Sequence, residues 1–217
     1  MLHNRSMSQP LTIVWLAIFI AALVWSGVAP KDYPTWVLEV FPALVGIVVM
    51  AWTFQRFPLT PLVYWLILVH SIILMIGGHY TYAEVPLGDW LGHVLGETRN
   101  NYDKLGHFAQ GFVPALIARE ILLRRRIVNG RGWTHFITVC ICLAISAFYE
   151  LIEWMVAMLS GQAADAFLGT QGYVWDTQSD MAWCLVGALT AIIILARLHD
   201  GQIARLVSRD ADTASST

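Results

Sequence analysis

Three pairs of ionisable side chains in this sequence have a spacing that places both members on one face of a helix, because residues three or four positions apart are neighbours there. The pairs are Asp103 with His107, Glu150 with Glu153, and Asp176 with Asp180. Carboxylates and imidazole are ligands that suit iron, manganese or zinc. Such pairs on facing helices form the carboxylate dimetal sites of helical bundles. We therefore predict that these six side chains bind one or two divalent ions (Fe, Mn or Zn).

The composition of the chain indicates the helices that must hold these pairs. Of its 217 residues 57% are hydrophobic and 13% charged, and the mean hydropathy is +0.60. Soluble domains are roughly 45–50% apolar and 25% charged. A span needs about 20 apolar residues. The sequence predicts one all-α, polytopic membrane domain over residues 1–217, with six transmembrane helices at 11–29, 35–54, 60–79, 104–123, 134–159 and 176–197.

The basic residues predict how this bundle is oriented, because lysine and arginine gather on the cytoplasmic side of membrane proteins. With both termini inside, ten of the 13 basic residues are cytoplasmic and only Lys31, Arg99 and Lys104 lie outside. We therefore expect an N-in/C-in protein, with both termini on the cytoplasmic side. The segment 80–102 is expected to be an outer loop with a short interfacial helix, and 160–175 a second outer loop. The polar tail 199–217 is expected to be disordered at its end.

This orientation brings the three pairs to one depth. His107 and Asp180 each lie about four residues inside the outer end of a span and Glu153 about six, which is roughly 6–9 Å at 1.5 Å per residue. Carboxylates gathered there would repel one another. Protons, water from an open cleft or metal cations must neutralise them.

Simpler roles are open for individual members of the set. Asp103 and Asp176 stand where helices begin, and an aspartate there caps the helix. Lys104 could pair with Glu150 or Glu153 to join two helices. His107 could be a histidine satisfied within the core.

Other polar residues are expected to matter less. We interpret Glu39 as a solvated acid at the membrane interface. Glu120 and Arg124 form an i, i+4 pair worth a few tenths of a kcal/mol. His79 and Tyr80 end the third span on the outer side and could complete the site.

The chain resembles a known family in several long motifs. They are GGHYTYAEVPLGDW, RNNYDKLGHFAQGFVPALIAREILLR, FYELIEW and FLGTQGYVWDTQSDM. With the six-span layout, these motifs are similar to the YjdF-like family of bacterial inner-membrane proteins, whose function is unknown. The resemblance covers nearly the whole chain and implies a multi-pass inner-membrane protein.

A more distant resemblance is to VanZ-like proteins, which share Asp-Lys-x-x-His, then Glu-x-x-Gln, then an Asp with an Asn and a Gly further downstream. Here Glu153 stands at the Gln position and Asp180 at the Asn position. This chain is thus more acidic than the VanZ-like pattern, which favours cation binding.

The sequence leaves three classes of function open. The first is a metal-dependent membrane enzyme acting on a lipid or envelope precursor, with Lys104 and Glu150 as catalytic candidates and Lys104 orienting an anionic group. The second is a proton- or cation-coupled small transporter, and the third is a structural role. The expected partners are membrane lipids and, as an open question, further copies of the chain. No nucleic-acid partner is predicted.

Overall fold

The chain is all helical over the residues that the computed structural model describes, which are 6–96, 99–160 and 171–215. The helices in these ranges are α1 (Gln9–Gly27), α2 (Tyr33–Thr53), α3 (Pro61–Tyr80), the 3₁₀ turn η1 (Tyr82–Glu84), α4 (Pro86–Leu95), α5 (Tyr102–Arg124), α6 (Arg131–Ser160) and α8 (Asp176–Ser215).

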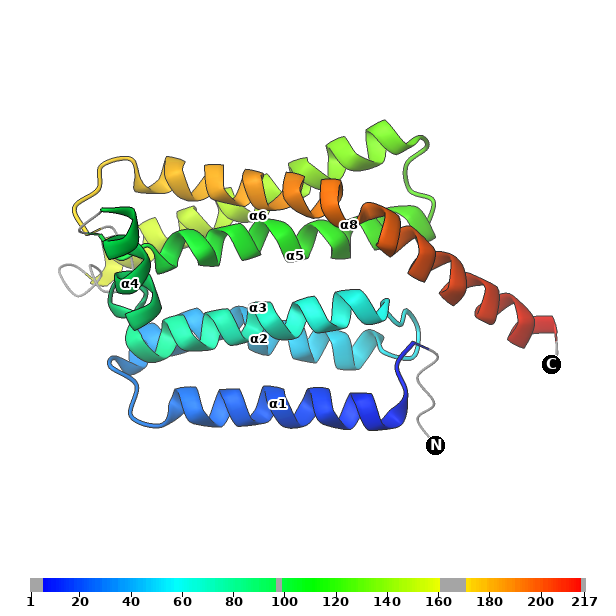
Figure 1. Ribbon diagram of the computed structural model, residues 1–217, viewed down its shortest axis with the longest axis horizontal. Coiled ribbons are helices and arrows are strands. Elements are labelled where there is room, and N and C mark those ends of the chain that lie inside the picture. Colours follow the sequence, from blue (N-terminus) through cyan, green and yellow to red (C-terminus); the bar gives the residue numbers. More distant parts are fainter. Residues whose placement is uncertain (1–5, 97–98, 161–170, 216–217) are drawn as a thin grey trace.

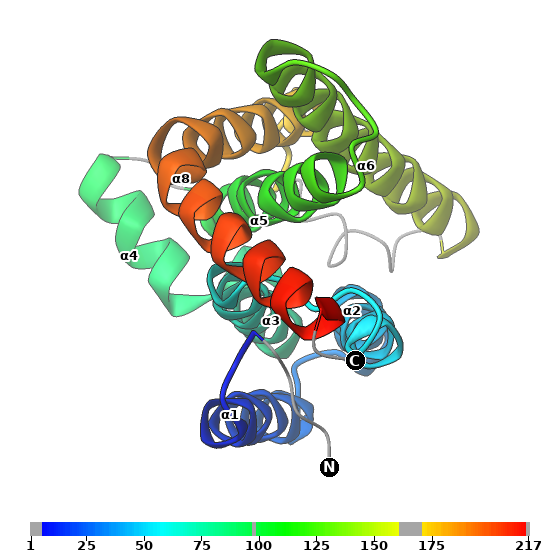
Figure 2. The same cartoon turned by 90° about the vertical axis from the view of Figure 1, so that its right-hand side faces the viewer.

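The long helices run alongside one another in two layers (Figure 1). One layer contains α1, α2 and α3, and the other contains α5, α6 and α8. Contacts between α3 and α5 join the layers. Both termini lie at one end of the bundle, and α4 lies at the other end. The end-on view in Figure 2 shows that the last part of α8 crosses from the upper layer toward the lower one.

Five of the described helices are long and apolar enough to span a membrane: α1, α2, α3, α6 and α8. The predicted sixth span corresponds to α5, whose sequence is more polar. This helix contacts α3, α6 and α8, so neighbouring helices cover much of its surface. The count of six spans and the N-in/C-in orientation stay predictions.

Several helix ends follow from local sequence. The Asp32 carboxylate accepts a hydrogen bond of 2.8 Å from the Thr35 amide and so caps α2. A proline stands in the first turn of α1, α2, α3 and α4, where its missing N–H has no helical partner to lose. Gly96 ends α4 with φ of +73°, a left-handed conformation that favours glycine.

The structure describes the two predicted outer loops, 80–102 and 160–175, to different extents. Within 80–102 the structure has the short helix α4, as expected. Of 160–175, residues 161–170 lie outside the described ones. The C-terminal end was expected to be disordered. This expectation is wrong for the residues up to Ser215, because α8 continues to that residue. Gln202 supports this extension, since its side-chain oxygen accepts from the Leu62 amide in the first turn of α3 (2.9 Å).

Glycines let α5 and α8 approach closely. A Cβ atom on Gly111 would lie 1.9 Å from the carbonyl oxygen of Cys184, and one on Gly187 would lie 2.1 Å from that of Phe108. These distances are far inside van der Waals contact, so only glycine allows the observed backbone separation. This approach sets the register between the helices that carry Asp103 and Asp180.

A fully buried polar network lies at the end of the bundle near the termini. The Glu120 carboxylate accepts hydrogen bonds from the Thr60 amide (3.1 Å), the Thr60 hydroxyl (2.8 Å), Arg124 (2.7 Å) and His199 (3.0 Å). Arg119 extends the network by contacting the other ring nitrogen of His199 at 3.3 Å. The interpretation of Glu120 and Arg124 as an isolated i, i+4 pair worth a few tenths of a kcal/mol is therefore wrong, because their hydrogen-bond network joins α3, α5 and α8.

Candidate metal centre

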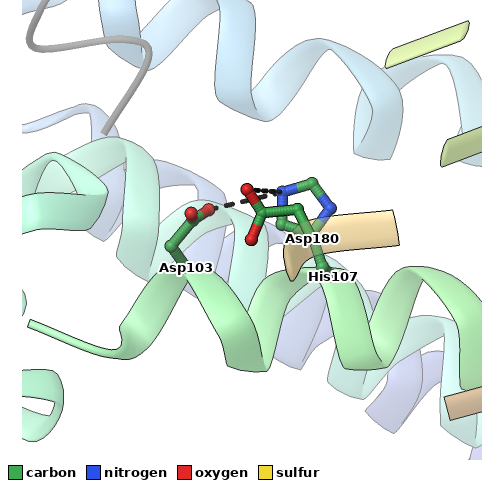
Figure 3. Close-up of side chains that lie close together, drawn as sticks. All are labelled: Asp103, His107 and Asp180. Carbon is green, nitrogen blue, oxygen red and sulfur yellow. Dashed lines mark ion pairs between the residues drawn. The ribbon is translucent and has the colours of Figure 1, made fainter. Parts of the chain in front are cut away.

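The predicted residues meet at the opposite end of the bundle, around the imidazole of His107. Its Nε2 atom lies 3.4 Å from Asp103 Oδ1, 3.8 Å from Glu150 Oε1 and 3.9 Å from Asp180 Oδ2. Figure 3 shows Asp103 and His107 on one turn of α5, with Asp180 beside the imidazole. All four side chains are buried. Helical spacing on α5 and packing against α6 and α8 together make this cluster.

The ligating atoms are close enough together for a metal ion. Two groups of three, Asp103–His107–Asp180 and His107–Glu150–Glu153, each have ligand atoms within 4.8 Å of one another. In a tetrahedral site with metal–ligand distances of about 2.1 Å, neighbouring ligand atoms are roughly 3.4 Å apart. Small side-chain adjustments would bring either group to that spacing. Because both groups share His107, the geometry favours one ion over two.

Gln110 orients the imidazole of His107. Its side-chain oxygen lies 3.1 Å from Nδ1 of His107. An amide oxygen only accepts hydrogen bonds, so Nδ1 must carry the proton. In the neutral ring the lone pair is then on Nε2, which faces the carboxylates. Metal-binding histidines are usually held in this way by a second hydrogen bond.

The carboxylates of the cluster are not fully satisfied. Glu150 Oε1 and Asp180 Oδ1 are buried and have no hydrogen-bond partner among the described residues. Glu153 is also buried, with 9% of its surface exposed. An unpaired buried carboxylate is unfavourable unless a proton or a cation is supplied.

Asp176 joins the cluster through a residue that the sequence prediction did not include. The guanidinium of Arg99 pairs with Asp176 and lies 3.7 Å from Asp103 Oδ2. Arg99 also stacks on the ring of Tyr173 at 5.1 Å. Asp176 therefore lies outside both groups of three and is connected to Asp103 through Arg99. Arg99 could have been suspected as the only arginine on the predicted outer side.

Glu39 was interpreted wrongly as a solvated interfacial acid. It is only 4% exposed, and the Tyr149 hydroxyl donates to it at 3.4 Å. Tyr82, in η1, interacts with the same carboxyl group. Burial, followed by the nearby Glu39, raises the pKa of the Tyr82 hydroxyl, which therefore stays protonated and can donate. The signal that could have identified Glu39 is its position inside a run that is otherwise apolar.

The remaining candidates occupy other surroundings. Lys104 is half-buried in the first turn of α5, next to Asp103. His79 contacts the Ser26 carbonyl at 3.1 Å and stacks with Trp25 of α1. The ring of Tyr80 packs against His79. His79 and Tyr80 thus face α1, and the structure does not bring them to the cluster.

Comparison with known proteins identifies the family. The model of the family described as "Predicted membrane protein (DUF2238)" matches residues 11–201. The inner membrane protein YjdF of Escherichia coli (strain K12) is 55% identical over 183 residues, covering 84% of this chain and 88% of that protein. No solved structure matches. The YjdF-like resemblance is confirmed, while the more distant VanZ likeness stays a prediction. The chain belongs to the DUF2238 family of membrane proteins and is an integral protein of the inner membrane.

Proposed function

We propose that this protein binds one divalent cation between α5, α6 and α8 and uses it as a membrane-embedded enzyme acting on a lipid or envelope precursor. His107, Asp103, Asp180, Glu150 and Glu153 would supply the ligands. The chemistry of the donor set, carboxylates with one imidazole, suits iron, manganese or zinc.

The observation that carries this proposal is a contrast within the molecule. At one end, the Glu120 carboxylate accepts four different donors, as a structural network requires. At the other end, Glu150 and Asp180 each have a buried oxygen without a hydrogen bond among the described residues. The same bundle thus supplies hydrogen-bond donors to one buried acid, Glu120, and leaves an oxygen of Glu150 and of Asp180 without one in the described part of the chain. Unsatisfied groups that converge on one point are typical of functional sites.

Charge supports a cation at this point. The cluster and its edge contain six carboxyl groups: Glu39, Asp103, Glu150, Glu153, Asp176 and Asp180. Among the described residues, Arg99 pairs with Asp103 and Asp176, and Lys104 follows Asp103 in the chain. A divalent ion bound by the inner carboxylates would reduce their mutual repulsion. It would also stabilise the folded protein by about 2.7 kcal/mol at a free concentration of 100 Kd.

Residues around the ligands have distinct roles in this proposal. Arg99 fixes Asp176, and Gln110 fixes the ring of His107. Lys104 is proposed to orient an anionic group of the substrate, and Glu150 to hold or move a proton through Oε1, which accepts no hydrogen bond among the described residues. A bound metal would polarise a substrate oxygen or activate water. The substrate class follows from the predicted depth of the cluster, about one to two helical turns below the outer surface.

The metal content of purified protein tests the first half of the proposal. Wild-type protein in detergent, prepared without chelator, is expected to contain close to one equivalent of iron, manganese or zinc by elemental analysis. Asp180→Asn and Glu153→Gln should each lose most of it. Glu84→Gln is the matched control, because Glu84 is an exposed acid outside the cluster and pairs with Lys31. Metal-free wild-type protein that also fails to bind added Fe²⁺, Mn²⁺ or Zn²⁺ would overturn the proposal.

A second experiment tests the enzymatic half. Metal-loaded protein is incubated with an extract of bacterial inner-membrane lipids, and the lipids are then compared by mass spectrometry. A lipid species converted by wild-type protein and not by Glu150→Gln is expected. If metal binds but no species changes in either lipid or envelope-precursor extracts, the enzyme assignment is wrong while the metal site stands.

A further inference from the structure

The short helix α4 presents three different faces. Successive residues are about 100° apart around a helix. Gly88 and Gly92 are buried and lie on the face that packs against the protein. Asp89 and His93 are exposed and lie on an adjacent polar face. A third, apolar face is exposed and contains Leu87 (54% exposed), Trp90 (61%), Leu91 (36%) and Val94 (63%).

The packed face holds α4 in a fixed position. A Cβ atom on Gly88 would lie 1.8 Å from Oδ1 of Asn100, so a glycine is required for this contact. The Asn100 amide donates to the Val85 carbonyl (2.8 Å) and to Asp89 Oδ1 (2.7 Å), and its oxygen accepts from the Tyr102 amide (3.0 Å). The exposed apolar face is therefore held outward by a buried polar network.

The position of α4 indicates what covers this face. Figure 1 places α4 at the end of the bundle that also contains the first turn of α5. In Figure 2, which looks along the long helices, α4 lies crosswise to them and at the edge of the bundle. An amphipathic helix lies in this orientation when it occupies the interface of a bilayer, with its apolar side among the acyl chains.

We propose that α4 lies in the plane of the membrane interface, with Leu87, Trp90, Leu91 and Val94 in contact with lipid acyl chains. The protein is membrane-embedded, so an exposed apolar face has lipid available to cover it. Tryptophan is enriched at this depth because its ring is apolar and its N–H needs a polar partner. Asp89 and His93, on the adjacent face, point toward headgroups and water.

This placement links the lipid surface to the candidate site. The Asn100 side chain donates a hydrogen bond to Asp89 of α4. The residue before it, Arg99, pairs with Asp176 and Asp103. Lipid contact with α4 thus fixes the segment that carries Arg99 at the edge of the cluster. The inference depends on membrane insertion alone and not on a bound metal, so it can fail while the proposed function stands.

Spin-label accessibility of the full-length protein tests the inference. Single cysteines replace Leu87, Val94, Asp89 or His93 in a Cys140→Ser background, because Cys140 is exposed whereas Cys142 and Cys184 are buried. The labelled proteins are reconstituted in 3:1 phosphatidylcholine–phosphatidylglycerol vesicles. Collisions with oxygen, which concentrates among acyl chains, are compared with collisions with a water-soluble nickel chelate.

Labels at 87 and 94 are expected to collide mainly with oxygen, and labels at 89 and 93 mainly with the nickel chelate. Equal access of the chelate to all four labels would overturn the proposal, because α4 would then be surrounded by water. Protection of 87 and 94 from both reagents, with dipolar broadening between labels, would also overturn it by showing a second copy on this face. A Leu91→Cys variant provides an independent apolar position if one of the others fails to fold.

Discussion

Gln110 and His107 are one helical turn apart on α5, and the Gln110 side-chain oxygen lies 3.1 Å from Nδ1 of the imidazole. This contact holds the ring so that Nε2 faces the carboxylates of three helices. Gln110 was not among the predicted site residues, although it follows His107 at i+3 and so shares its face.

Replacing Gln110 tests whether this orientation matters for metal binding. Gln110→Ala should weaken metal affinity by about 10–100-fold, because the ring loses the partner that fixes its tautomer and direction. Competition with a fluorescent chelator in detergent measures the affinity. Gln110→Glu retains an acceptor and should keep most of the binding. Equal affinity in wild type and Gln110→Ala would show that the contact has no role in binding.

The close approach of α5 and α8 at Gly111 should be necessary for the cluster. Gly111→Ala places a Cβ against the Cys184 carbonyl and forces the helices apart. The expected cost is at the upper end of about 1–3 kcal/mol for overpacking. Asp180 should move away from His107, so the metal content should fall together with the thermal unfolding temperature.

Gly46→Ala is the matched control for this variant, because Gly46 lies inside α2 and a Cβ there meets nothing within 4 Å. It should be as stable as wild type or slightly more stable, since alanine is the better helix former. If Gly111→Ala behaved like Gly46→Ala, the observed separation of α5 and α8 would be incorrect.

The Glu120 network should contribute to stability without affecting the metal. Glu120→Ala leaves Arg124 and His199 without their buried acceptor and should destabilise the protein by about 3–5 kcal/mol. Unfolding in detergent by chemical denaturant measures this change. Arg131→Gln removes an exposed partner of Asp200, and its effect should stay below about 1 kcal/mol. A loss of metal in folded Glu120→Ala protein would contradict the separation of the two networks.

The orientation of the bundle can be tested with single exposed cysteines at its two ends. In a Cys140→Ser background, Glu84→Cys should react with a membrane-impermeant thiol reagent added to spheroplasts, because Glu84 lies at the end predicted to be periplasmic. Asn129→Cys, in the arginine-rich connection, should react only after the membrane is permeabilised. The opposite pattern would place the candidate metal centre on the cytoplasmic side.

The class of the protein and most members of the candidate cluster could be predicted from the amino-acid sequence. Apolar runs of span length reveal membrane helices because lipid demands them. Acids inside such runs are conspicuous because burial is costly for them. The spacing of Asp103 with His107, and of Glu150 with Glu153, placed each pair on one helical face before any fold was known.

Which polar residues face one another across helices could not be predicted, because it depends on how the whole bundle packs. Glu39 is far from His107 in sequence, and no local spacing indicates that helix packing brings it to Tyr149 at the edge of the cluster. Arg99 is four residues before Asp103, but its pairing with Asp176, 77 residues away, depends on the fold. The same limit applies to Glu120, whose partners Thr60 and His199 come from α3 and α8. Helical periodicity is a local property, whereas the pairing of faces depends on close contacts such as the one at Gly111, and these form only when the whole bundle packs.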